Sequence, residues 1–179
     1  KNPWDLPENP RIRAAEMYVE AAGNEAAEGL KKLAEKAAET NVRVRALHLM
    51  AERNVEGAAD MLQDKAAGSG AKDLDPAVRA AAAVALGKTG SQAAGKVLVE
   101  LYRDQSPNGK TAVRAGACGG LAELCGRIGP DDALSQGARG DLVDTFLELA
   151  AQSGSGGAGP ELRSAAIRAA AHMGAFSTP

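Results

Sequence analysis

The chain has 179 residues, of which 45% are hydrophobic and 25% are charged, a composition typical of one globular domain. Its formal net charge is −2, with 21 basic and 23 acidic residues, so no overall positive field attracts a nucleic acid or an anionic membrane surface. The longest unbroken apolar stretch, residues 80–86, is far shorter than the roughly 20 residues that span a bilayer. Composition therefore predicts no nucleic-acid partner and no membrane insertion.

The first nine residues, KNPWDLPEN, lack the pattern of a helix. Trp4, the only tryptophan, lies between Pro3 and Pro7, and proline favours extended backbone over helix. We therefore predict an extended N-terminal arm over residues 1–9. Trp4 either caps the exposed end of the first helix pair or anchors a protein partner.

Residues 10–38 and 39–72 are each predicted to form a pair of helices, whose second members cover residues 25–37 and 55–67. In the first helix of the second pair, two sets of residues compete for the buried face. These sets are Val42, Ala46, Leu49 and Met50, against Val44, Leu47, His48 and Ala51. We favour the first set because it aligns Arg43 with Arg79 of the next pair and leaves His48 at the edge.

The segment DLDPAVRAAAAVALGKTG, residues 73–90, gives the clearest helix. Asp75 is a suitable N-cap, and Pro76 suits the first turn because its missing N–H would have no partner there. The apolar stripe that follows consists of Val78, Ala81, Ala82, Ala85 and Leu86. Small side chains allow close approach of another helix, so we expect this helix to pack between neighbours. A second helix over residues 92–103 completes the unit, residues 73–110.

Residues 111–159 and the half unit 160–179 repeat the pattern. Their stripes share offsets, with Val113, Gly116, Ala117, Gly120, Leu121 and Leu124 matching Leu162, Ala165, Ala166, Ala169, Ala170 and Met173. The extra length of the fourth unit, whose second helix is predicted at about 138–151, divides between GRIGPDDALSQG and the linker SGSGGAGP. Ile167 and Phe176 lie off the buried stripe. We therefore expect this end either to continue in further repeats or to dock on a partner.

Each predicted first helix opens with an arginine in the same position, at intervals of roughly 30–50 residues, which is typical of helical-repeat arrays. The five residues, called here the arginine ladder, are Arg13, Arg43, Arg79, Arg114 and Arg163. The recurrence predicts an all-α solenoid of antiparallel helix pairs.

The segment DLDPAVRAAAAVALGKTG resembles a HEAT repeat of the short type found in phycobilisome-lyase-like proteins. Units of that type begin Asp-Pro-x-Val-Arg-x-x-Ala and carry Ala-Leu-Gly seven residues after the valine. The third unit matches almost fully, the fourth and fifth match in their first halves, and the first two lack the Ala-Leu-Gly ending.

The resemblance implies a right-handed α-solenoid of HEAT-like repeats. It also implies that the ladder arginines are structural and reach acidic residues at unit boundaries. The acidic residues available for this are Glu39, Asp73, Asp75 and Asp104. Alternatively, the arginines form an anion-binding stripe. The resemblance says little about function, because the family includes scaffolds, enzyme subunits and nucleic-acid binders.

The sequence contains few residues of the types that catalytic and metal sites use. His48 and His172 are its only histidines, and neither is followed by the glutamate of a paired di-iron motif. The two cysteines, Cys118 and Cys125, lie in one predicted helix beyond disulfide reach, and no zinc-ligand spacing occurs. We predict that the chain is not an enzyme and holds no metal or cofactor. Buried free thiols mildly favour a reducing compartment such as the cytoplasm, and a processed or exported protein is the alternative.

The predicted function is a non-catalytic scaffold that binds a protein partner or assembles a complex. The alternative is an accessory or chromophore-lyase-like subunit acting on a protein-bound cofactor, which a pocket lined by Cys118 or His48 would favour. The predicted partner anchors are Trp4, Ile167 and Phe176.

Overall fold

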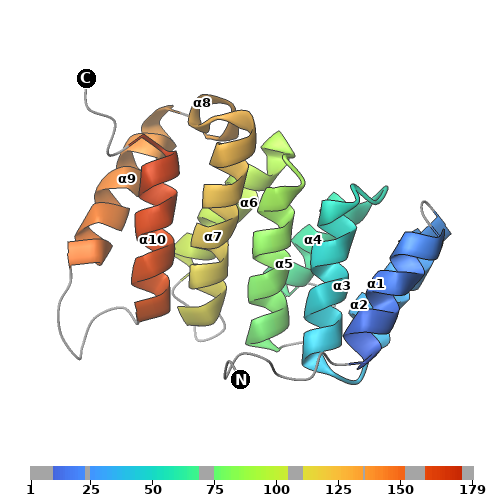
Figure 1. Ribbon diagram of the computed structural model, residues 1–179. Coiled ribbons are helices and arrows are strands. Elements are labelled where there is room, and N and C mark those ends of the chain that lie inside the picture. Colours follow the sequence, from blue (N-terminus) through green and yellow to red (C-terminus); the bar gives the residue numbers. More distant parts are fainter. Residues whose placement is uncertain are drawn as a thin grey trace, which may run out of the picture.

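The computed structural model describes residues 10–22, 25–68, 75–104, 111–134, 136–151 and 160–174, and these contain helices and no strand. Trp4, Phe176, the arm 1–9 and most of the linker SGSGGAGP lie outside these residues. The helices, shown in Figure 1, are α1 (Pro10–Ala22), α2 (Ala26–Lys36), α3 (Thr40–Glu52), α4 (Ala58–Ala67), α5 (Pro76–Lys88), α6 (Gln92–Arg103), α7 (Thr111–Ile128), α8 (Pro130–Ala133), α9 (Gln136–Ala151) and α10 (Pro160–His172). The predicted all-α fold is confirmed.

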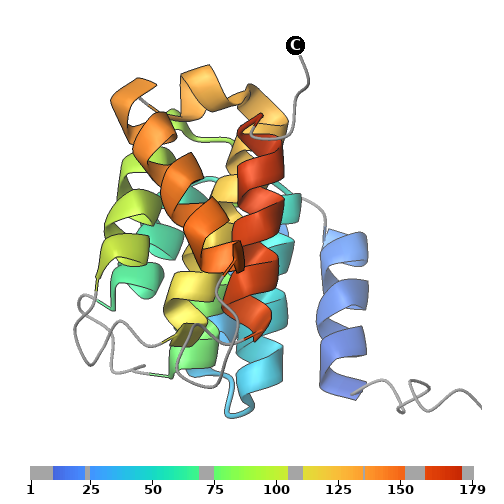
Figure 2. The ribbon, with the colours of Figure 1, turned by 90° about the vertical axis from the view of Figure 1, so that its left-hand side faces the viewer.

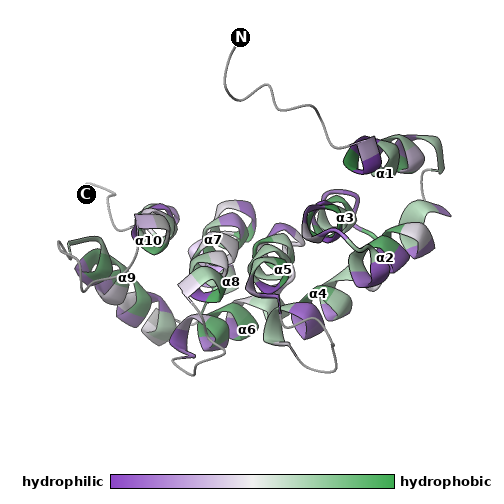
Figure 3. Cartoon of the chain, turned by 90° about the horizontal axis from the view of Figure 1, so that it is seen from below, coloured by the Kyte–Doolittle hydropathy of each residue, from purple (hydrophilic) through white to green (hydrophobic). Residues whose placement is uncertain are grey.

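The helices form two curved rows, seen end-on in Figure 3. The inner row contains α1, α3, α5, α7 and α10, and it lines the concave side of the arc. The outer row contains α2, α4, α6 and α9. Helix α1 stands farther from its neighbours than the other inner helices do, as Figures 2 and 3 both show. The arrangement is that of a HEAT-type α-solenoid.

Helix α5 begins as the sequence predicts. The Asp75 carboxylate accepts a hydrogen bond of 2.9 Å from the backbone N–H of Ala77, and Pro76 occupies the first turn. A second bond of 2.8 Å comes from the hydroxyl of Thr40 at the start of α3. Asp75 therefore caps its own helix and joins it to the preceding unit.

Replacing Asp75 with alanine is expected to lower the free energy of unfolding by about 1 kcal/mol, the usual cost of a lost N-cap. The hydrogen bond from Thr40, and to a smaller extent the bond from Ala77, lowers the pKa of the Asp75 carboxyl. Its stabilisation is therefore complete above the ordinary pKa of an aspartate and is lost as the pH falls through the lowered value. Urea unfolding of wild type, D75A and D75N between about pH 7 and pH 2 tests this. Because asparagine also caps helices, D75N should retain most of the stability at neutral pH while losing this pH dependence; identical curves for all three would contradict the expectation.

Glycine and alanine bring α5 and α7 into close backbone contact. A Cβ atom added to Gly87 would overlap the carbonyl oxygen of Gly120, and one added to Gly116 would overlap that of Ala80. This confirms the expectation that the alanine-rich helix packs between neighbours, since α5 also contacts α3, α4 and α6.

The favoured buried face of α3 is confirmed but incomplete. Its residues Val42, Ala46, Leu49 and Met50 are buried, and so are Leu47 and Ala51 from the competing set. Both sets contribute because α3 packs against α2 on one side and α5 on another. Val44 and His48 are only partly buried.

Much of the segment GRIGPDDALSQG is helical. Helix α7 continues through Ile128, and α8 follows at Pro130. Ala133 and Leu134 are buried, and the Ala133 carbonyl lies where a side chain on Gly95 of α6 would otherwise be. This short helix was not predicted, because one turn is too brief to show a periodic pattern.

Candidate functional site

The ladder arginine of α3 connects two units. One Nη atom of Arg43 donates to the carbonyl of Ala37, which follows α2, at 3.0 Å. The other lies 3.3 Å from a carboxylate oxygen of Asp75, at the start of α5. Arg43 therefore contacts an acidic residue at a unit boundary.

The ladder arginines of α5 and α7 bind the ends of preceding helices. Arg79 is only 5% exposed and donates to the carbonyls of Ala66 and Ala67 at 3.1 and 3.3 Å. Arg114 donates to the carbonyl of Tyr102 at 3.0 Å, and its guanidinium carbon lies 5.2 Å from the Tyr102 ring centroid. These contacts are to backbone carbonyls at the negative, C-terminal end of a helix, a kind of partner that the sequence does not predict.

The first ladder position differs from the three central ones. Arg13 pairs with Glu16 of its own helix at 3.5 Å, whereas Arg11 reaches Glu39 at 2.8 Å. Arg163 lies partly buried near the start of α10.

Arg139 was missed by the sequence analysis. It donates twice to the carbonyl of Met173, at 3.0 and 2.7 Å, and thereby connects α9 to the end of α10. It also pairs with Asp131 of α8 at 2.6 Å. Its position near the start of a second helix gave no repeat signal.

The concave side carries a chain of ion pairs across three helices. Arg45 of α3 contacts Glu16 of α1 at 2.9 Å and Glu52 of its own helix at 3.3 Å. Lys88 of α5 lies 3.7 Å from Glu52. These pairs connect the inner helices at the N-terminal end of the array.

His48 lies on α3 beside these charges, and it lines an open hollow of about 790 Å³ together with Ile12, Val44 and Arg45. Its Nδ1 atom is buried and has no hydrogen-bond partner among the described residues. Burial lowers the pKa of the His48 imidazole, and the nearby Lys88 ammonium lowers it further. His48 is therefore held in its neutral form.

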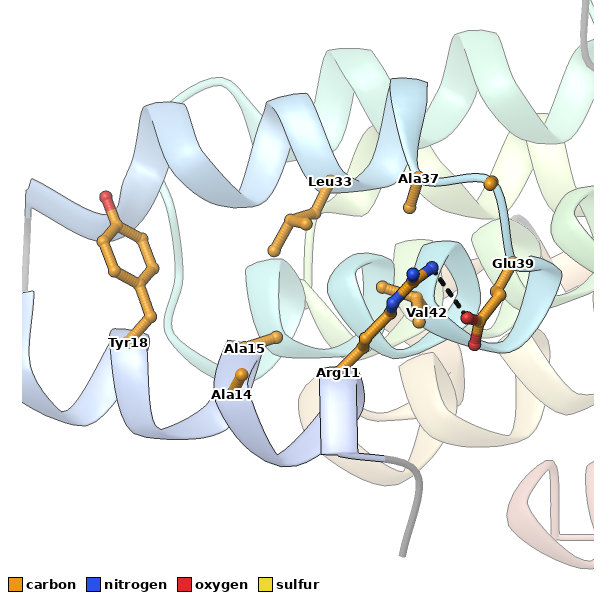
Figure 4. A pocket seen from close by; sticks show the side chains of 9 residues that line it. Arg11, Ala14, Ala15, Tyr18, Leu33, Ala37, Glu39 and Val42 are labelled. Carbon is orange, nitrogen blue, oxygen red and sulfur yellow. Dashed lines mark hydrogen bonds and ion pairs between the residues drawn. The ribbon is translucent and has the colours of Figure 1, made fainter.

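An apolar groove of about 360 Å³ separates α1 from α2 and α3 (Figure 4). The Arg11–Glu39 ion pair lies at one end of the groove and Tyr18 at the other. Ala15 and Leu33 line its middle. The Tyr18 ring covers the space that a side chain on Gly29 would need, so this ring contacts α2 at one end of the groove while the groove stays open.

Both cysteines are buried in α7, as predicted. Burial raises the pKa of the Cys118 thiol to about 12 and that of Cys125 to about 11. Neither group forms the reactive thiolate near neutral pH.

Native protein is therefore expected to react with a thiol reagent such as iodoacetamide only through unfolding. At about pH 8, labelling followed by mass spectrometry should be at least tenfold slower than for the same chain in guanidinium chloride. Rapid labelling of Cys118 in the folded protein would contradict this expectation.

The described residues hold no group of three or more potential metal ligands. Among the described helices, none combines the length and the apolarity that crossing a bilayer requires.

Comparison with known proteins finds a family match for part of the chain. Residues 27–113 match the family model for HEAT repeats, which covers α2 to α6 and reaches the start of α7. No curated protein and no solved structure matches the chain. The match names HEAT repeats in general and does not distinguish the phycobilisome-lyase-like type. The matched repeats and the two-row arrangement of helix pairs agree: residues 27–113 are HEAT repeats, and the chain folds as a HEAT-type α-solenoid.

Proposed function

We propose that the chain is a non-catalytic scaffold module that binds a protein partner or assembles a complex. HEAT repeats are generally protein-interaction scaffolds. The observation that carries the proposal is apolar exposure at both ends of the array. Met17 and Tyr18 on α1 are 56% and 43% exposed, and Ile167 on α10 is 45% exposed. Apolar side chains at such positions are typical of protein contacts.

Within this proposal, the units are residues 10–38, 39–72, 73–110 and 111–159 with the half unit 160–179. The arginine ladder has a structural role. Arg43, Arg79 and Arg114 support this role because each contacts the preceding unit. The proposed partner anchors are Ile167, Trp4 and Phe176. Trp4 and Phe176 lie outside the described residues.

The test is affinity purification of the full chain from its source, followed by reconstitution of each candidate complex from purified proteins. The variants are Ile167→Ser and Met17→Ser, because both side chains are exposed and neither is part of the helix packing described above. Gly140→Ala is the control, because a Cβ atom at Gly140 meets nothing within 4 Å. We expect a reconstituted complex that at least one end variant weakens about tenfold or more. A complex that no end variant weakens, or no reconstituted complex at all, would contradict the proposal.

A second candidate is the accessory or lyase-like subunit, for which the hollow beside His48 is the supporting observation. Cys118, the other residue predicted for this function, counts against the candidate. Its side chain is fully buried and its thiol stays protonated. Turnover of a protein-bound cofactor that His48→Ala abolishes would favour this candidate over the scaffold.

A further inference from the structure

A second cavity of about 350 Å³ opens on the concave side between α5, α7 and α10. Its apolar part consists of Val84 and Ala122, and its charged part includes Arg127 of α7 and Arg168 of α10. The volume lies at the lower end of the range of ligand pockets, about 300–1,000 Å³. The cavity is large enough for a side chain or chain terminus of a ligand rather than for a large cofactor.

Glycines shape this cavity. A Cβ atom on Gly126 would lie 3.1 Å from Nδ1 of His172, and one on Gly119 would lie 3.2 Å from a methyl carbon of Val84. Both distances are shorter than ordinary van der Waals contact. The absence of side chains at these two positions lets the His172 ring lie close to α7 and leaves the space of the cavity unfilled on the α7 side.

Among the described residues, the two arginines lack the polar contacts that hold most arginines of the inner helices. Within the described parts of the chain, neither Arg127 nor Arg168 makes a hydrogen bond or an ion pair. Arg43, Arg45 and Arg79 are all engaged by carboxylates or carbonyls. Two exposed guanidinium groups therefore border one cavity with their donors available.

The charges select the class of ligand. The planar guanidinium binds carboxylates through paired, charge-assisted hydrogen bonds, and His172 adds an imidazole at the same cavity. Glu123 lines the cavity too, and Glu52 lies farther along the concave side. These carboxylates and the net charge of −2 disfavour a nucleic acid, whose long row of phosphates needs extended positive potential. A short acidic segment needs only a local positive site beside an apolar surface.

We propose that this α7/α10 cavity binds a carboxylate of an acidic peptide segment in the partner protein. The inference rests on the proposed scaffold function and names the chemistry of its partner. Arg127 and Arg168 hold the carboxylate, and the surface formed by Val84, Gly119 and Ala122 accepts the small or aliphatic part of the neighbouring residue.

The test uses the full chain and a fluorescein-labelled hexaglutamate peptide, with binding followed by fluorescence anisotropy. We expect saturable binding that weakens with added salt and falls at least about tenfold in the double variant R127A/R168A. The matched control is R11A/R103A, which removes the same charge from exposed arginines of α1 and α6 and should bind like the wild type.

Circular dichroism of both double variants checks their folding, and a ¹⁵N-labelled wild-type sample provides a second readout. Addition of hexaglutamate should shift the amide resonances of Gly119 and Gly126 and leave Gly57 unchanged. Equal loss of binding in the two double variants would overturn the proposal, as would shifts confined to other glycines. Tighter, Arg127-dependent binding of a thymidine hexamer or of inorganic phosphate would also overturn it.

The two proposals fail separately. A protein complex that reconstitutes while hexaglutamate does not bind would refute the acidic-peptide site and leave the scaffold function standing. Hexaglutamate binding that depends on Arg127 and Arg168, without any reconstituted protein complex, would support the site and count against the scaffold.

Discussion

Replacing Arg79 with alanine is expected to lower the free energy of unfolding by about 2–3 kcal/mol. The wild-type guanidinium is almost fully buried and donates to the carbonyls of Ala66 and Ala67 at the end of α4. Its loss leaves these carbonyls without their charged donor and opens a space beside Gly68, since Nε of Arg79 lies 3.2 Å from where a Cβ on that glycine would be. Chemical denaturation measures the effect.

Arg103→Ala is the matched control for Arg79→Ala. The Arg103 side chain is 55% exposed and lies 3.8 Å from a carboxylate oxygen of Asp141, and such surface pairs contribute about 0–1 kcal/mol. Equal midpoints of chemical denaturation for the Arg79→Ala and Arg103→Ala variants would show that the buried arginine does not hold adjacent units together. Arg79→Lys should recover only part of the loss, because one ammonium cannot reproduce the fork of the guanidinium.

Replacing Gly87 with alanine is expected to destabilise the protein by about 3 kcal/mol, at the upper end of the usual cost of overpacking. The added methyl group would occupy the position of the Gly120 carbonyl oxygen in α7. Backbone atoms cannot rotate away as a flexible side chain can, so α5 and α7 must separate. Thermal and urea unfolding should both show the loss.

Gly140→Ala is the control for this second change. Gly140 lies inside α9 with open space around its Cα, so alanine there should stabilise the helix by about 0.5–1 kcal/mol. The same chemical substitution is thus expected to have opposite signs at two helical positions. Stabilisation by Gly87→Ala would mean that the α5–α7 contact is looser than the structure shows.

The sequence predicts the fold well where the apolar pattern is regular. The second helix at residues 92–103 is predicted at both ends, because its stripe is continuous and its neighbours are turn residues. The Asp75 cap is equally predictable, because its residue types act locally. Helix α8 is not, because a single turn has no period and depends on contacts with α6.

The candidate sites are less predictable than the helices. The position of each ladder arginine follows from the repeat, but the choice between a carboxylate and a helix carbonyl as partner depends on how neighbouring units are stacked. Arg11 contacts Glu39 although the repeat register points to Arg13, and Arg139 has no counterpart in the repeat. The α7/α10 cavity joins residues far apart in the chain, so only the folded arrangement brings Arg127 and Arg168 to one place.

The open groove beneath α1 has a consequence for how the molecule unfolds. This helix buries only Ala15 and Val19, whereas α7 buries residues along its whole length. In a repeat array each element is stabilised by its nearest neighbours, so α1 can detach in a local opening that leaves the α5–α7 contact intact. Its amide hydrogens will therefore exchange with solvent well before those of α7. The Arg11–Glu39 and Arg45–Glu16 pairs are screened by salt, so raising the ionic strength selectively accelerates this exchange at the N-terminal edge.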